Sequence, residues 1–420
     1  MIWPGHGAVP CGTGSGQVSG VPERLISGLR DVELAIVPTP SAHFGVGGLS
    51  KLGAVLAAQQ CAAAVIVTDP GMLATPVIEA VQQSLDDAGL PYLVFGGVHA
   101  NPTTDDLGAG AEVVAELAVA SRAVLIAVGG GSSIDAAKGI ALAAVNPERG
   151  RGLDYRNQFA TPGLPVVAIP TTAGTGAETN AFGVVTDPLT RTRFYVGHAS
   201  TLPAAAILDP ALTTGLPAPA TAATGFDALT HAIESFLSVR ANPWSDGIAL
   251  QVISMVAAHL GRACADGSDL EARSQLLLAS HMAGIGMATT GLGLAHAVGH
   301  AIGGRHDLAH GVTLAMVLPQ VLAFSAPVRR ERLAGVAFAL GAGDRARDAE
   351  WNAAACVDAV AALRDAIGLP GRPAAAGIGP GDYSELAATA LADEVLANAP
   401  RQPSAAEIEE LLADPAGAAP

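Results

Sequence analysis

The first half of the chain alternates short apolar runs with stretches of amphipathic helical periodicity. Four runs have the continuous apolar character of strands buried on both faces of a sheet, namely 63–67, 92–95, 123–128 and 166–169. Helical periodicity fills the intervals between them, at 76–88, 107–118 and 133–145. Strands that alternate with helices in this way predict an α/β fold with a parallel sheet and right-handed connections.

The second half of the chain has a different pattern. After Pro217 the strand-like runs disappear, and long helices rich in Ala and Leu are predicted at 221–239, 243–265, 270–287 and 353–367. We therefore expect an N-terminal extension over residues 1–36, an α/β domain over 37–218 and an all-helical domain over 219–420.

Composition raises the question of a membrane protein. Half of the 420 residues are hydrophobic, only 14% are charged, and mean hydropathy is +0.40. Between Arg273 and Arg305 there is no Lys, Arg, Asp or Glu, and this stretch is long enough to span a bilayer. It contains three His and several Gly, however, and no second stretch of that length is evident. We expect a buried segment that contributes to a site, and no membrane partner.

Charge and cysteine content narrow the alternatives further. The net charge of −16 argues against a nucleic-acid partner. The four Cys show neither CxxC pairs nor the spacing of a zinc knuckle, and they suggest no disulfide framework. The first 20 residues lack the basic and apolar regions of a signal peptide. These features favour a cytoplasmic protein.

Three polar loops follow predicted strands. The strand at 123–128 leads into Gly129–Gly131 and a new helix, where free N–H groups and the helix dipole favour an anion. A full GxGxxG is absent because Ile134 replaces the third Gly, so a tight turn is the alternative. Asp69 suits a ribose diol but is equally interpretable as a turn or helix-entry residue, and residues 170–176 are rich in Thr and Gly. Together the loops favour a nucleotide site.

A second constellation consists of Asp and His. Asp227 and His231 are four residues apart, which places them on one face of a helix, and His296 and His300 repeat that spacing. With His310, this set suits a divalent ion such as Fe²⁺, Zn²⁺, Co²⁺ or Ni²⁺ better than Mg²⁺. A structural metal site and hydrogen-bonded core histidines are the alternatives. We interpret two further histidines, His281 and His306, as structural.

These motifs together resemble the iron-containing (group III) metal-dependent alcohol dehydrogenase family, which includes lactaldehyde reductases and 1,3-propanediol dehydrogenases. The resemblance spans about residues 44–412. It rests on ordered stretches at 44–47, 67–69, 101–103, 129–138, 170–175, 223–234 and 291–300.

The resemblance implies an α/β dinucleotide-binding domain followed by an all-α metal-binding domain, the dehydroquinate synthase-like architecture. It implies metal ligation by Asp227, His231, His296 and His310, with Fe²⁺ favoured and Zn²⁺ possible. His300 matches a histidine near the nicotinamide that relays a proton, a role that an imidazole can perform near neutral pH. The implied cofactor is NAD, favoured over NADP because of Asp69. The implied cofactor contacts are Asp69, Asn101, Gly130, Gly131, Ser132, Thr171, Thr172, Thr175, Arg193 and Leu202.

The chain departs from the family pattern in places. Arg193 stands where members often have Lys, the expected pocket walls Phe182, Met287 and Leu396 are variable positions, and the N-terminal extension has no counterpart.

The predicted function is reversible hydride transfer between nicotinamide C4 and a small primary alcohol or aldehyde, in a homo-oligomer, most simply a homodimer. The alternatives are a metal-free maleylacetate reductase, a dehydroquinate-synthase-type NAD-using lyase, and a binding protein without turnover.

Overall fold

The computed structural model describes residues 36–117, 120–190 and 192–413, which all belong to one compact unit. The predicted N-terminal extension therefore lies outside the described residues, apart from its last position. All of the named strands precede residue 209, and all of the helices longer than 13 residues follow residue 217. The predicted division at residue 218 falls at the first residue of helix α6, and the division into two domains stays a prediction.

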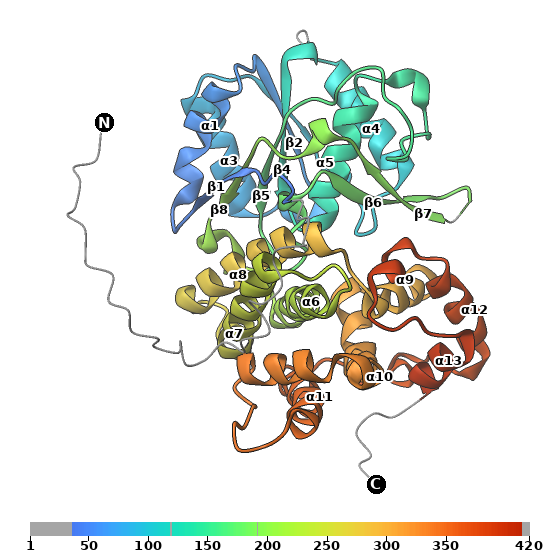
Figure 1. Cartoon of the computed structure of the whole chain (residues 1–420). Coiled ribbons are helices and arrows are strands. Elements are labelled where there is room, and N and C mark those ends of the chain that lie inside the picture. Colours follow the sequence, from blue (N-terminus) through green and yellow to red (C-terminus); the bar gives the residue numbers. More distant parts are fainter. Residues whose placement is uncertain (1–35, 118–119, 191, 414–420) are drawn as a thin grey trace, which may run out of the picture. The chain divides into compact units, whose positions relative to one another are not determined.

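The first part of the unit contains a parallel six-stranded sheet (Figure 1), in the order β1-β8-β5-β4-β2-β3. Its strands are β1 (Ser41–Phe44), β2 (Ala63–Val67), β3 (Tyr92–Phe95), β4 (Ala123–Gly129), β5 (Val166–Pro170) and β8 (Ala205–Leu208). Every residue of β2, β4 and β5 is buried, which explains their continuous apolar runs. An antiparallel pair, β6 (Phe182–Asp187) and β7 (Thr192–Gly197), forms a separate small sheet.

Helices cover both faces of the large sheet, and successive strand residues enter opposite cores. Leu125 of β4 belongs to one hydrophobic cluster with residues of α4 (Thr104–Ala115) and α5 (Gly131–Ala143). Its neighbour Ile126 belongs to another cluster with residues of α1 (Leu52–Ala58) and α3 (Pro76–Asp87). The predicted parallel α/β fold is therefore confirmed.

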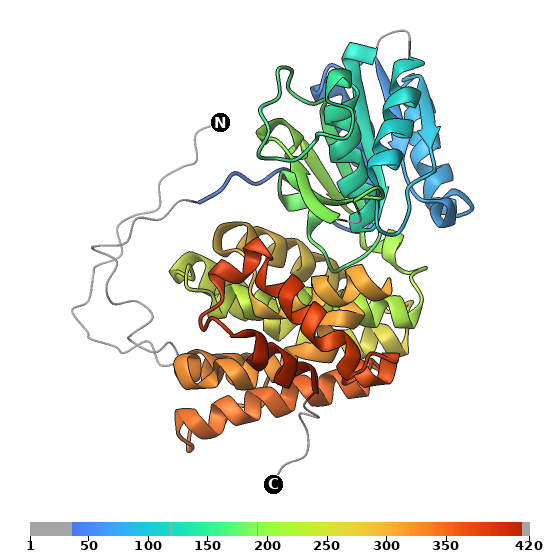
Figure 2. The same cartoon turned by 90° about the vertical axis from the view of Figure 1, so that its right-hand side faces the viewer.

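The helical elements follow in sequence. They are α6 (Ala218–Leu237), α7 (Pro243–Ala265), α8 (Leu270–Thr290), α9 (Leu294–His306), α10 (His310–Ala339), α11 (Ala349–Ala366), α12 (Pro380–Leu391) and α13 (Ala405–Ala413). They share one large hydrophobic core, within which α10 and α11 pack side by side, as Figure 2 also shows. Near the C-terminal end of the described chain, the short helix η10 (Glu394–Asn398) lies between α12 and α13.

The charge-free stretch is divided between two helices, α8 and α9, which meet at an angle of 106°. The expectation that no other stretch has the length of a membrane span is wrong, because α7 and α10 are each long and apolar enough. The physical reason is the scarcity of charge, which lets helices that line a protein core reach the hydropathy of a span. The apolar window of α10 is 72% buried inside the protein.

Candidate active site

The three polar loops predicted to bind a nucleotide lie at the ends of the neighbouring strands β2, β4 and β5. They approach one another closely. A Cβ added at Gly130 would lie 3.3 Å from Thr172 Cγ2, and one at Gly131 would lie 2.7 Å from Thr175 Cγ2. Glycine at position 131 is therefore required for the third loop to pack against the start of α5.

The start of α5 offers unpaired backbone donors. Its N-cap, Gly130, supplies no side-chain hydrogen bond, so the first N–H groups of the helix are available to an anion. The hydroxyl of Ser132 donates to the carbonyl of Ala100, and the N–H of Thr171 donates to Gly129 O at 2.9 Å. This arrangement is what a pyrophosphate cradle requires.

Asp69 caps a helix in addition to its predicted role in binding the ribose of the cofactor. Its Oδ1 accepts a hydrogen bond from the N–H of Met72 at 3.1 Å and caps the short helix α2 (Pro70–Leu73). Its Oδ2 would lie 3.4 Å from a Cβ at Gly129. The carboxylate thus lies beside the glycine loop while it holds the next helix in place.

Two other predicted cofactor residues contact each other. Arg193, on β7, donates to Asn101 Oδ1 at 2.8 Å, and Asn101 Nδ2 donates to Asp307 Oδ1 at 2.9 Å. Burial lowers the pKa of Arg193, and the nearby Asp307 carboxylate opposes this shift. Asp307 directly follows α9, so Asn101 links the loop after β3 to the end of the helix that carries His296 and His300. Leu202 lies further away in sequence, just before β8.

The four predicted metal ligands meet at one point. Asp227 and His231 come from α6, His296 from α9 and His310 from the first turn of α10. One donor atom of each residue lies within 4.8 Å of every other. The Nε2 atoms of the three histidines are 3.3, 3.7 and 3.6 Å from Asp227 Oδ1, in the order given. Donors at about 2.1 Å from one ion in a tetrahedral site are about 3.4 Å apart, so the spacing fits a metal.

Unpaired polar atoms also indicate a cation. Asp227 Oδ1 and His296 Nε2 are buried and have no hydrogen-bond partner within the described part of the chain. Leaving a buried polar atom unpaired costs about 1–3 kcal/mol, and a divalent ion bound by both would remove this cost. The three imidazoles and one carboxylate are donors that Fe²⁺ and Zn²⁺ accept.

Burial and neighbouring charges shift the pKa values of these four side chains in different directions. Burial lowers the pKa of His231 to about 4, although the Asp227 carboxylate opposes the shift. Burial acts in the same direction on His296, but the nearby carboxylates of Asp227 and Glu234 outweigh it and raise that pKa to about 9. Burial would raise the pKa of Asp227, yet His231 and His310 lower it below its ordinary value. The carboxylate is therefore ionised at neutral pH.

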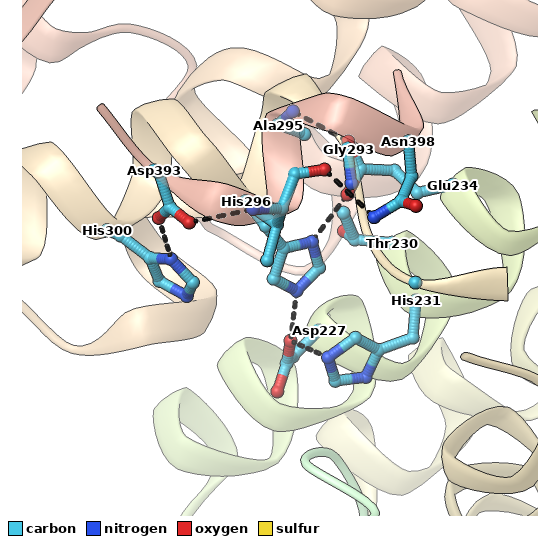
Figure 3. A network of polar contacts seen from close by, with 12 residues as sticks. Asp227, Thr230, His231, Glu234, Gly293, Ala295, His296, His300, Asp393 and Asn398 are labelled. Carbon is cyan, nitrogen blue, oxygen red and sulfur yellow. Dashed lines mark hydrogen bonds and ion pairs between the residues drawn. The ribbon is translucent and has the colours of Figure 1, made fainter. Parts of the chain in front are cut away.

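Two carboxylates that the sequence analysis did not assign to the site hold its histidines (Figure 3). Glu234, on α6, lies 2.6 Å from His296 Nδ1 and accepts from the N–H of Gly293 at 3.0 Å. Asp393 lies 2.7 Å from His300 Nδ1. The position of Glu234 three residues after His231 was a usable signal, because carboxylates often orient metal-binding imidazoles. Asp393 is 93 residues from His300 in sequence, and no spacing pointed to it.

Other predicted residues lie in varied surroundings. Phe182, on β6, is 46% exposed and packs edge-on against Tyr155, whereas Leu396, on η10, is buried in the core of the helical elements. Met287 lies on α8 and is partly buried. His281, interpreted as structural, pairs with the buried Glu178 at 3.0 Å.

The chain matches known proteins along most of its length. Residues 38–210 match the family model described as iron-containing alcohol dehydrogenase, and residues 221–415 match the C-terminal model of the same family. A probable alcohol dehydrogenase, EutG, of Salmonella typhimurium is 36% identical over 92% of this chain and 95% of that protein. The NAD-dependent methanol dehydrogenase of Bacillus methanolicus is 34% identical over 89% and 97%, respectively. A crystal structure of a 1,3-propanediol oxidoreductase superposes with a TM-score of 0.87 at 32% identity, over 91% of this chain and 99% of that one.

Proposed function

The chain belongs to the iron-containing alcohol dehydrogenase family, and we propose that it is an NAD-dependent alcohol dehydrogenase and aldehyde reductase. It transfers a hydride reversibly between nicotinamide C4 and a small primary alcohol or aldehyde. The observation that carries the proposal is the convergence of Asp227, His231, His296 and His310 within 4.8 Å. Members named methanol dehydrogenase, 1,3-propanediol dehydrogenase and lactaldehyde reductase support a short substrate.

We propose Fe²⁺ as the metal, held by these four side chains, with Zn²⁺ as the alternative that their donor atoms also accept. The family description supports iron. When bound, such an ion supplies Lewis acidity, which polarises a carbonyl or acidifies an alcohol. Of the chain's own residues, Glu234 orients His296, and the carboxylate of Asp227 provides the one negative charge among the four donors.

The cofactor proposal is NAD rather than NADP. The N-terminal end of α5, against which the Thr171–Thr175 loop packs, would hold the pyrophosphate. Asp69 would hold the adenosine ribose and repel a 2′-phosphate. Asn101, Arg193, Ser132 and Leu202 complete the proposed contacts. His300 carries a proton between the reacting oxygen and solvent, because its side chain is 18% exposed and lies one helical turn from His296.

We also propose that the protein is cytoplasmic, acts as a homodimer and binds neither nucleic acid nor a membrane. The dinucleotide-binding and metal-binding domains would divide near residue 218, where the strands give way to long helices. The edge strand β1 supports self-association, because an exposed edge can pair with a second chain.

Two other activities are weaker alternatives. A maleylacetate reductase without a metal does not account for two buried donor atoms that lack a partner among the described residues. A dehydroquinate-synthase-type lyase needs several basic groups around an acidic substrate, and the described surroundings of the four donors are dominated by histidines and carboxylates.

The proposal is tested by following NADH absorbance with methanol, ethanol, 1,2-propanediol and 1,3-propanediol, and with the corresponding aldehydes in reverse. We expect turnover with at least one pair and a higher kcat/KM with NAD⁺ than with NADP⁺. Absence of turnover with every pair, in protein loaded with Fe²⁺ or with Zn²⁺, would refute the proposal. A preference for NADP⁺ would refute only the assigned role of Asp69.

A further inference from the structure

His300 is held by a carboxylate from a distant part of the chain. Its Nδ1 lies 2.7 Å from Oδ2 of Asp393, and the two side chains are only 18% and 15% exposed (Figure 3). His300 belongs to α9, whereas Asp393 lies between α12 and η10. The pair therefore joins the helix that carries a metal ligand to the C-terminal part of the structure.

The backbone around Asp393 is firmly anchored. Its own N–H donates to Ala390 O at 3.2 Å, and its Oδ1 accepts from the N–H of Val395 at 3.0 Å, so it caps η10. Leu396 is 5% exposed, and Asn398 O accepts from the N–H of Val239 at 3.0 Å. Because these contacts fix the carboxylate, it can act as a rigid support for the imidazole.

Contacts on the other side restrict the ring of His300 as well. It stacks on the ring of His310, with centroids 5.3 Å apart and planes at 22°, and meets the ring of His296 edge-on at 5.8 Å. Its Nδ1 is the ring nitrogen that pairs with Asp393. A carboxylate on Nδ1 favours the tautomer that carries its proton there, which leaves a lone pair on Nε2.

We propose that Asp393 is a positioning residue that holds the imidazole of His300 as the Nδ1–H tautomer, so that Nε2 accepts and returns the substrate proton. This inference rests on the proposed dehydrogenase function. In alcohol oxidation the O–H bond breaks and its proton passes to His300 Nε2. The C–H bond breaks as hydride moves to C4 of NAD⁺, and the C=O bond forms. Nε2 then releases the proton to solvent, so that alcohol and NAD⁺ yield aldehyde, NADH and H⁺.

The kinetic test is a double-mutant cycle between Asp393→Asn and His300→Gln. Asparagine keeps the size of the side chain, but its amide group can donate to Nδ1 and favour the wrong tautomer. We expect Asp393→Asn to lower kcat by at least about 10-fold, with little change in the KM for NAD⁺ or in bound metal. In the His300→Gln background the same substitution should change kcat by less than about 2-fold, because the residue it positions is already gone.

Glu385→Gln provides a matched control. Glu385 also faces α9 from α12, through Arg305, but its side chain is 65% exposed and it does not contact His300. This variant should retain wild-type kcat. Equal losses from Asp393→Asn in both backgrounds would show that Asp393 supports the fold only, and would overturn the proposal.

A second readout does not depend on turnover. In protein labelled with ¹⁵N-histidine and loaded with diamagnetic Zn²⁺, His300 should show a protonated Nδ1 and an unprotonated Nε2 by NMR, and Asp393→Asn should abolish this pattern. An unprotonated Nδ1 in the wild type would overturn the positioning role. If the wild type has the expected tautomer but oxidises no alcohol, the dehydrogenase proposal fails and the Asp393–His300 assignment survives.

Discussion

At the level of single residues, His296 links the proposed metal site to protonation. Its Nδ1 faces Glu234 and its Nε2 faces Asp227, at 2.6 and 3.7 Å. Burial alone would lower its pKa, but the two carboxylates raise it to about 9. A metal that binds Nε2 must displace the proton held there.

Metal binding should therefore release a proton at every pH below about 9. Since the protonated form competes with the metal, apparent affinity should rise with pH up to that value and level off above it. Calorimetric titration of the metal-free protein with Zn²⁺ near pH 7, in buffers of different ionisation enthalpy, measures the proton count. A count of zero would contradict this account of His296.

The substitution Glu234→Gln tests the same link between metal binding and proton release. Glu234→Gln removes one of the two carboxylates that stabilise the imidazolium, and it also weakens the orientation of the ligand. It should release fewer protons on binding and bind metal about 10–100-fold more weakly. Glu79→Gln, at an exposed position on α3, is the control that should leave both quantities unchanged.

At the scale of elements, the sequence was most informative where local signals agree. The range 243–265 was predicted correctly because Asn242 caps α7 and Pro243 occupies its first turn. Helix α4 begins earlier than the predicted residue 107, because Thr103 and Asp106 form a capping box. The predicted strands at 63–67 and 92–95 coincide with β2 and β3.

Other elements carried weaker signals. Strand β1 has four residues on an edge and is mostly exposed, so it forms no apolar run. Strand β8 is a short, buried apolar run of four residues that the sequence analysis did not assign. Most residues of helix α9 are buried, including Gly299 and Gly303, so the helix lacks the alternation of apolar and polar faces that reveals a helical period. Of the site, local i, i+4 spacing indicated Asp227 with His231, whereas the resemblance to the family was needed to separate the proposed ligands His296 and His310 from His300. Asp393 could not be predicted, since only tertiary packing brings it to His300.

The close contact between the Thr171–Thr175 loop and the start of α5 can be tested by substitution. Gly131→Ala places a Cβ 2.7 Å from Thr175 Cγ2, so the Thr loop must shift away from the helix that it flanks. We expect NADH binding, measured by fluorescence titration, to weaken by at least about 10-fold, since a misplaced group at a binding site costs more than 1.4 kcal/mol. Metal content should not change.

Gly108→Ala is the matched control for that substitution. Gly108 is exposed on α4, and a Cβ there would meet nothing within 4 Å. This variant should bind NADH like the wild type and gain up to about 1 kcal/mol in the free energy of unfolding. Equal NADH affinity in both variants would contradict the role given to the start of α5.

At the scale of the whole molecule, the apolar composition is accounted for by burial. Two hydrophobic clusters line the faces of the large sheet, and a third fills the helical elements. The stretch without charge supplies α8 and α9 to that third cluster, and it delivers His296 and His300 to the site. Low charge therefore reflects the amount of chain that must pack in the interior around a few functional polar groups.

We propose that alcohol oxidation by this chain depends on a metal ion bound by Asp227, His231, His296 and His310. The most direct measurement is alcohol-dependent NADH formation by the wild type and by Asp227→Ala, with the divalent metal in each preparation quantified by mass spectrometry. We expect about one metal ion per wild-type chain, and turnover that chelation abolishes and that Fe²⁺ or Zn²⁺ restores. Asp227→Ala should retain its fold and its NADH binding but lose both metal and turnover. Alcohol oxidation that persists after removal of the metal or in Asp227→Ala would contradict this dependence on a bound metal.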